Sequence, residues 1–224
     1  MKPLQSVAGL ISAILLFAPA HSHASNDPNK DKIQSILDRG GRLVQSKQYD
    51  KAIEEYQKAL QVDPKSRSTL LALGSVSVLA GKYDKAEEYT QSLIQIEPSY
   101  PAYKNMAIIL ANQSRFEEAV DFYKKALEFS PTSYGGWYQL GLVYAALQHY
   151  PEAIDAYQNT LKYNPAYSDA YLGLGSAYFK SGDKAKALEQ VSKLKGLKKE
   201  YEAQALENWI THSEASGSES PPKP

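Results

Sequence analysis

The chain has 224 residues, of which 43% are hydrophobic and 22% charged, a composition that can bury a core in one or two domains. Its 25 lysines and arginines balance 25 aspartates and glutamates, which argues against a nucleic-acid binder, because such proteins typically carry a basic face. The chain contains no cysteine, so disulfides, thiolate zinc sites and thiolate nucleophiles are excluded.

The first 24 residues have the layout of a secretory signal peptide. A short basic start precedes an almost wholly apolar run, Val7 to Phe17, and small residues follow. We expect cleavage between Ala24 and Ser25, with a second possible cut a few residues earlier. The apolar run is shorter than the roughly 20 residues that a membrane-spanning helix needs. The sequence therefore predicts an exported chain, periplasmic or secreted, with no membrane span after signal removal. An uncleaved anchor or a buried N-terminal helix is the alternative.

Past this segment the sequence repeats itself. Four prolines, each two residues after an apolar residue, are separated by 34, 33 and 34 residues: Pro64, Pro98, Pro131 and Pro165. Ahead of each proline, an alanine is followed four residues later by an aromatic residue or a substitute for one. The pairs are Ala52/Tyr56, Ala86/Thr90, Ala119/Tyr123 and Ala153/Tyr157, and a fifth pair, Ala187/Val191, follows the last proline. A constant period of this length is typical of repeat proteins.

Each repeat divides into two helical stripes, which the fourth repeat shows most completely. Trp137, Leu140, Gly141 and Tyr144 have the i, i+3, i+4, i+7 spacing of one helix face. A second stripe begins with Ala153, and the small residues let the two helices approach closely. Each repeat is therefore predicted to be a pair of packed helices.

These residues resemble the tetratricopeptide-repeat (TPR) family, whose pattern runs W-x2-L-G-x2-Y, then A-x3-F, then P. In the second repeat, Ser77 and Thr90 replace the expected aromatic residues. The resemblance implies an all-α fold, a right-handed α-solenoid of five helix-turn-helix repeats with a C-terminal capping helix. The expected segments are a polar leader at 25–32, repeats at 33–66, 67–99, 100–133, 134–167 and 168–199, the capping helix at 200–212, and a disordered tail at 213–224.

The resemblance also implies that the first helix of each repeat lines a concave groove. Residues off the packing stripe are then expected to face a protein or peptide partner: Leu71, Ser75, Val78, Lys104, Asn105, Ile108, Asn112, Tyr138, Gln139, Leu142, Leu172, Ser176 and Phe179. Tyr138 is the first candidate, because most other tyrosines fall on packing positions. Lys104 and Asn105 come next, as a clamp for a partner's carboxylate or backbone.

The sequence does not predict a catalytic site. His149 and His212 are isolated, so they suggest neither a metal site nor a nucleophile–base pair, and we expect no enzyme activity and no cofactor.

The predicted function is a scaffold or adaptor of a bacterial envelope that binds a partner segment in the groove. Two alternatives stay open. One is an accessory subunit of an envelope enzyme, binding through Trp209 and Ile210 of the cap or through the convex face. The other is a structural module that self-associates through its terminal repeats.

Overall fold

The computed structural model describes residues 27–216, which are almost entirely helical and include no strand. The helices are α1 (Pro28–Gln45), α2 (Tyr49–Val62), α3 (Arg67–Leu79), α4 (Tyr83–Ile96), α5 (Tyr100–Asn112), α6 (Phe116–Phe129), α7 (Tyr134–Ala146), α8 (Tyr150–Tyr163), α9 (Ser168–Lys180), α10 (Lys184–Gly196) and α11 (Glu200–Ser216). No helix among the described residues is both long and apolar enough to cross a membrane.

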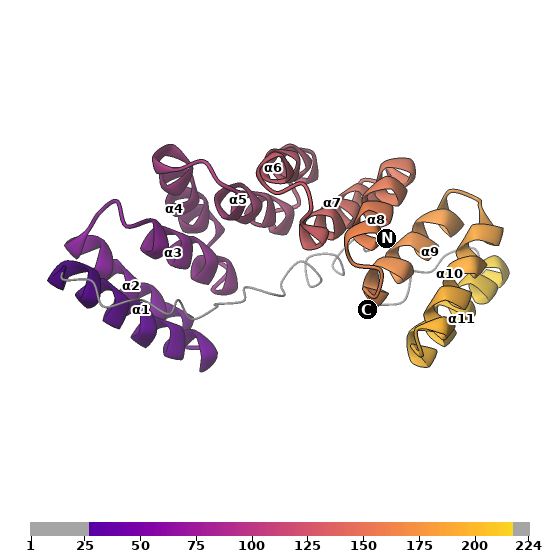
Figure 1. Ribbon diagram of the computed structural model, residues 1–224, viewed down its shortest axis with the longest axis horizontal. Coiled ribbons are helices and arrows are strands. Elements are labelled where there is room, and N and C mark those ends of the chain that lie inside the picture. Colours follow the sequence, from indigo (N-terminus) through magenta and orange to yellow (C-terminus); the bar gives the residue numbers. More distant parts are fainter. Residues whose placement is uncertain (1–26, 217–224) are drawn as a thin grey trace. The chain divides into compact units, whose positions relative to one another are not determined.

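The described residues form two compact units, 27–126 and 127–216, with the boundary inside α6 (Figure 1). In the first unit α1 packs against α2 and α3 against α4, while α3 also contacts α1 and α5. In the second unit α7 packs against α8, α9 against α10, and α11 against both α10 and α9. Each unit is thus a stack of helix pairs, as the sequence predicts for an all-α repeat fold.

The tight turns within the helix pairs share one hydrogen-bond pattern. Each contains a residue with positive φ, and the next backbone N–H donates to the carbonyl five residues earlier at 2.8–2.9 Å, as in Gln48 to Leu43 and Lys82 to Ser77. This is the Schellman arrangement, which satisfies carbonyls left free at a helix end. Glycine supplies the positive φ in two turns, Gly81 and Gly182, where it carries no Cβ penalty.

The connections between successive pairs follow from the prolines. Asp63, Glu97 and Asn164 end α2, α4 and α8 with ψ between 86° and 101°, and a proline follows each of them. A proline ring clashes with a helical conformation of the residue before it, so the chain leaves the helix in an extended conformation. The second helix of each of these pairs therefore stops where the proline spacing predicts.

Small residues and tyrosines pack together between helices. A Cβ at Gly40 would overlap the ring of Tyr56, and one at Gly141 would lie 2.7 Å from Cε1 of Tyr157. The Tyr157 ring also fills the space above Gly173, where a Cβ would lie 2.6 Å from its Cζ. Close contact of this kind leaves no room for even a methyl group, and this explains the glycines at these repeat positions.

The second repeat solves the same packing problem differently. Thr90 stands where the first, third and fourth repeats have a tyrosine, and Asn105 of α5 fills the remaining volume. The Asn105 side chain is 2% exposed and its Nδ2 donates a hydrogen bond to Thr90 Oγ1 at 3.1 Å. Asn105 is therefore a core residue, and its predicted place on the binding face is wrong. The physical reason is that the inward-facing Asn105 amide makes a hydrogen bond in the core. If the side chain faced outward, it would leave a cavity beside Thr90.

Both ends of the array differ from the expected segments. Helix α1 starts within the predicted polar leader, because Pro28 suits the first helical position and the Asp27 carboxylate accepts a hydrogen bond from the Asn29 N–H. Helix α11 runs to Ser216, past the start of the predicted tail. Between α10 and α11 there is no proline, and the chain turns through Lys198 with φ 58°, as it does within a pair. The signal peptide and the cut between Ala24 and Ser25 lie outside the described residues.

Candidate binding site

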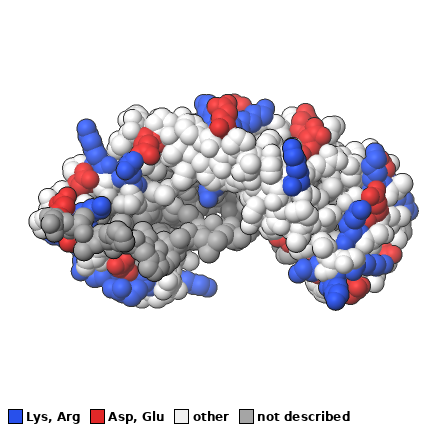
Figure 2. Space-filling view, in the orientation of Figure 1, with Lys and Arg blue, Asp and Glu red and all other residues white. Residues whose placement is uncertain are grey.

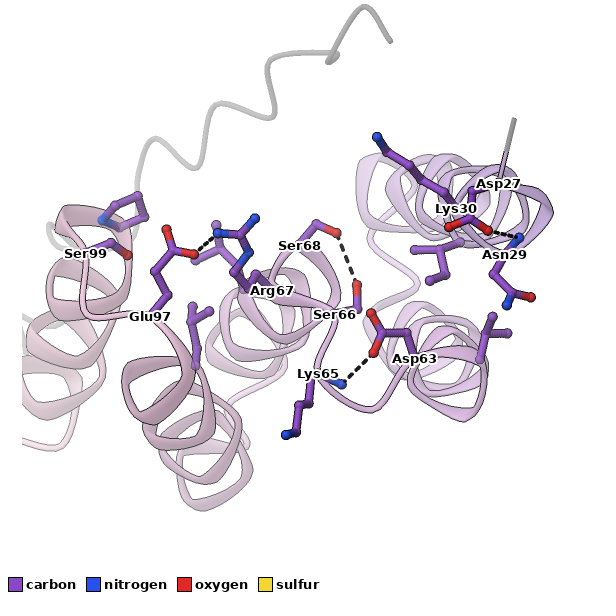
Figure 3. A pocket seen from close by; sticks show the side chains of 15 residues that line it. Asp27, Asn29, Lys30, Asp63, Lys65, Ser66, Arg67, Ser68, Glu97 and Ser99 are labelled. Carbon is purple, nitrogen blue, oxygen red and sulfur yellow. Dashed lines mark hydrogen bonds and ion pairs between the residues drawn. The ribbon is translucent and has the colours of Figure 1, made fainter. Parts of the chain in front are cut away.

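A pocket of about 740 Å³ lies in the first unit, where helix ends from three successive pairs meet. Its walls come from the N-terminal ends of α1, α3 and α5 and the C-terminal ends of α2 and α4. The lining residues are Asp27, Asn29, Lys30, Ile33, Val62, Asp63, Lys65, Ser66, Arg67, Ser68, Leu71, Leu93, Glu97, Ser99 and Pro101. In Figure 3 the α1 residues stand on one side of the pocket and Arg67, Glu97 and Ser99 on the other.

Apolar side chains line the pocket next to the polar ones. They are Ile33, Val62, Leu71, Leu93 and Pro101. Ile33 and Leu93 are also buried in the cores beneath α1 and α4, and Leu71 is half-buried. Apolar walls combined with a few convergent polar groups are the usual lining of a binding pocket.

Charges of both signs line the pocket and largely compensate each other. Arg67 and Glu97 form an ion pair across the α3–α4 side. The Asp63 carboxylate accepts a hydrogen bond from the Lys65 N–H at 2.9 Å, which holds the turn before α3 (Figure 3). Three cations and three acids line the pocket in all. On the face shown in Figure 2, acidic and basic side chains are likewise interspersed over each unit.

A strip of half-buried side chains continues from the pocket along the first helices of the unit. We call it the open strip, and it consists of the half-buried side chains of Leu37 of α1, Leu71 of α3, and Lys104, Ile108 and Asn112 of α5, together with the half-buried Gly41 of α1, which has no side chain. Corresponding positions in successive repeats face the same side of a stack of helix pairs. Leu71 belongs to both pocket and strip, and Pro101 of the pocket precedes Lys104 by one helical turn. The pocket therefore adjoins the open strip at α3 and α5.

Lys104 is the one charged residue of the open strip. Its Nζ lies 5.6 Å from the centroid of the Tyr100 ring, and no carboxylate among the described residues pairs with it. Burial lowers the pKa of the Lys104 ammonium from its ordinary value, because removal of water disfavours the charged form.

The predicted binding residues of the first unit divide into two groups. Leu71, Lys104, Ile108 and Asn112 are half-buried and belong to the open strip. Ser75 and Val78 are 1% and 8% exposed and, like Asn105, lie within the core between the helix pairs. The helical period places Ser75 and Val78 on the same side of α3 as Leu71, but neighbouring helices cover these two positions.

In the second unit, Tyr138 is a packing residue. It is 6% exposed, and its ring meets those of Tyr157 at 5.9 Å and Tyr167 at 5.0 Å, the latter edge-on. Tyr167 precedes α9 and covers the face that the helical phase predicts to be free. Leu172 is buried as well, at 4% exposure. The remaining predicted residues of this unit are half-buried: Gln139, Leu142, Ser176 and Phe179.

The cap residues proposed as an alternative contact are also covered. Trp209 is 6% exposed and its ring meets Phe179 edge-on at 4.9 Å, while Ile210 is fully buried. Both belong to the core that α9, α10 and α11 share. Their burial removes them as a contact surface in the folded unit.

The pocket itself was not among the sequence predictions. It depends on α1 starting at Pro28, which brings Asp27 and Lys30 to the ends of α3 and α5. The Asp27-Pro28 pair is a helix-start signal that could have indicated this. Among the described residues, no group of three or more histidine or acidic side chains is placed to hold a metal ion.

Comparison with known proteins identifies the repeat. Three family models, each described as tetratricopeptide repeat, match residues 43–107, 100–133 and 138–202. No curated protein matches the chain by sequence. Among solved structures, a crystal structure of MamA is 26% identical with a TM-score of 0.66, and the match covers 72% of this chain and 95% of that one.

Two further structures share the fold at lower identity. YrrB, described as a TPR protein with an unusual peptide-binding site, is 16% identical with a TM-score of 0.64, and the match covers 85% of this chain and 100% of that one. A thermophilic TPR protein of Thermus thermophilus is 22% identical with a TM-score of 0.60, and the match covers 82% of this chain and 99% of that one.

Proposed function

Because the chain belongs to the tetratricopeptide-repeat family, we propose that it is a non-catalytic scaffold or adaptor of a bacterial envelope. It holds a segment of a partner protein against the pocket and open strip of the first unit. The observation that carries this proposal is that Leu71, half-buried on the first helix of the second repeat, also lines the pocket. A surface that combines apolar side chains with a few polar groups suits an extended or helical segment.

The physical properties of this surface favour a peptide-like ligand. Helices α1, α3 and α5 are fixed by their own cores, so binding requires little ordering of the scaffold. The pocket volume of about 740 Å³ falls in the usual range of ligand-binding pockets. A peptide-binding site in the YrrB structure supports such a role by analogy of fold.

A site-specific cross-linking experiment tests the location of the site. A photoreactive phenylalanine analogue replaces Ile108 in the full chain, expressed in a cell with a double-membrane envelope and irradiated there. The matched control carries the same analogue at Glu88, an exposed residue of α4. We expect a cross-linked partner from position 108 and none from position 88. Equal cross-linking at both positions, or only from position 88, would place binding on another face.

The envelope location rests on the first 24 residues, whose apolar run and small residues are typical of a cleaved signal. Fractionation of cells that express the full chain, followed by sequencing of its N-terminus, tests it. We expect a chain beginning at Ser25 outside the inner membrane. A chain that keeps Met1 and stays in the cytosol would contradict the location and leave the binding proposal in place.

A further inference from the structure

The connection between α10 and α11 is a turn whose residues are all exposed. We call residues 195–201 the terminal turn, and two of its exposed side chains are large and apolar, Leu197 at 37% exposure and Tyr201 at 83%. Lys198, with φ 58°, stands at the apex, because the N–H of the next residue donates to the Leu194 carbonyl at 3.0 Å. Packing within the unit does not explain an exposed leucine and tyrosine on one tight turn.

The terminal turn is basic in a chain whose charges balance. Its lysines outnumber its acids by three to one, Lys195, Lys198 and Lys199 against Glu200. Two of the lysines have acidic neighbours on α11, at 2.9 Å for Lys195 and 3.6 Å for Lys199, and both side chains remain 46% exposed. Ion pairs in water are weak, and Lys198 pairs with no carboxylate among the described residues. The turn therefore presents hydrated ammonium groups to its surroundings.

The other large apolar side chains that are exposed in the described part of the second unit lie at the same end of its helix pairs. Phe129 is 53% exposed at the end of α6, and Tyr134 is 42% exposed at the start of α7. Connections from one pair to the next lie at one end of a stack of helix pairs. At the α8–α9 connection, Lys162 Nζ lies 5.3 Å from the centroid of the Tyr163 ring. One edge of the second unit thus combines apolar side chains with lysines.

We propose that this edge docks the protein on the surface of a bilayer that contains anionic phospholipids, with the terminal turn as the principal contact. Leu197 and Tyr201 insert at the level of the headgroups, where a tyrosine can bury its ring and keep its hydroxyl in water. The lysines of the turn lie against lipid phosphates. The docking edge belongs to the second unit and makes no use of the pocket or the open strip, so it is independent of the proposed function.

The spacing of the apolar side chains favours a lipid surface over a protein partner. A stable protein interface buries about 800 Å² on each partner around a closely packed core. On this edge the exposed apolar side chains are separated by polar residues and by whole repeats, with one pair at the α6–α7 connection and the other at the terminal turn. A fluid bilayer interface accepts separated anchors, because each side chain can insert by itself.

Vesicle flotation tests the charge requirement. The chain from Ser25 onward contains every described residue and lacks the apolar N-terminal run. It is mixed with vesicles of phosphatidylglycerol and phosphatidylcholine, or of phosphatidylcholine alone. We expect binding to the anionic vesicles that weakens as salt rises. Lys198→Gln with Lys199→Gln should reduce this binding about tenfold. The matched control is Lys47→Gln with Lys51→Gln at the α1–α2 turn, where Lys47 also has positive φ, and it should bind like the wild type.

A second pair of substitutions tests the apolar contact. Leu197→Ser with Tyr201→Ser should also reduce binding to the anionic vesicles about tenfold. Ile96→Ser, at a 39% exposed position of the first unit, is the control and should leave binding unchanged. All the replaced side chains are exposed, so circular dichroism should show the same helix content in every variant.

A fluorescent label locates the contact. Because the chain contains no cysteine, a single introduced cysteine takes a nitrobenzoxadiazole label at a chosen position. Gly196→Cys puts the label on the terminal turn, where an added Cβ meets nothing within 4 Å. Ala185→Cys puts it at an exposed position near the other end of α10. We expect the anionic vesicles to shift the emission of the label to the blue at position 196 and not at position 185.

Several results would overturn the docking proposal. They are equal binding to neutral and anionic vesicles, binding that neither pair of substitutions in the terminal turn weakens, and a blue shift at position 185 without one at position 196. An absence of binding to both kinds of vesicle would also overturn it. None of these results bears on segment binding in the first unit, which the cross-linking experiment tests separately.

Discussion

At the scale of single residues, Thr90 and Asn105 act as a matched pair. Thr90 is smaller than a tyrosine, and Asn105 fills the space beside it and donates a hydrogen bond to its hydroxyl. At the corresponding positions two repeats later, the Tyr157 ring packs against Gly173 instead. We expect Thr90→Tyr alone to overpack the site and lower the free energy of unfolding by about 1–3 kcal/mol. Asn105→Gly alone should cost a similar amount, because it removes a buried hydrogen bond and leaves a cavity.

The double variant tests whether the two residues compensate each other. A tyrosine ring at position 90 above a glycine at position 105 would reproduce the arrangement of Tyr157 and Gly173. The double variant should therefore be more stable than the sum of the single effects predicts, by about 1 kcal/mol or more. Urea unfolding of the four chains, followed by circular dichroism, measures the coupling. Simple additivity would show that the two positions are independent.

At the scale of the helix, two adjacent glycines of α1 have opposite surroundings. A Cβ at Gly40 would overlap the Tyr56 ring, whereas a Cβ at Gly41 would have nothing within 4 Å. Gly40→Ala should lower the free energy of unfolding by about 1–3 kcal/mol through overpacking. Gly41→Ala should raise it by about 0.5–1 kcal/mol, because alanine loses less entropy in a helix. Midpoints of urea unfolding measure both, and changes of the same sign would refute the assigned faces.

The helices also show what the sequence could predict. Prolines and turn residues determine the backbone conformation of their immediate neighbours. The spacing of the prolines therefore predicts where the first helices of the repeats begin, and α3, α5, α7 and α9 do begin at Arg67, Tyr100, Tyr134 and Ser168. The exposure of the candidate binding residues was harder to predict, because helical phase gives the side of the helix on which a residue lies and not what covers it. Tyr138 is covered by Tyr167, a residue outside any helical stripe. Asn105 faces the core, where it donates a hydrogen bond to Thr90 of the preceding repeat.

At the scale of the whole molecule, each unit depends on contacts between neighbouring helix pairs. Ion pairs also link successive repeats at the surface, from Lys82 to Asp50 at 2.5 Å and from Arg115 to Glu87 at 3.0 Å. Such exposed ion pairs contribute little each. Stability is therefore expected to come from the repeated tyrosine cores, with fully buried rings in three of the repeats at Tyr56, Tyr123 and Tyr157.

The tyrosine cores predict how the chain unfolds in alkali. Burial raises the pKa of Tyr56 to about 12 and also raises the pKa of Tyr123 and Tyr157. Below about pH 10 these phenols are neutral in both the folded and unfolded states, so the stability associated with them is fully present. Above that pH the unfolded chain ionises while the folded chain keeps its protons, and stability is lost as the pH rises through the folded pKa.

Ultraviolet absorbance at the phenolate band, recorded together with helical circular dichroism, follows this transition. We expect phenolate absorbance from the buried rings to appear only with the loss of helix. Tyr56→Phe should move that loss to higher pH, since it removes one linked proton. The change should disturb the fold little, because the buried Tyr56 hydroxyl has no hydrogen-bond partner among the described residues. Full ionisation of all tyrosines with the helices intact would show that the rings are accessible to water and that the repeat cores are loosely packed.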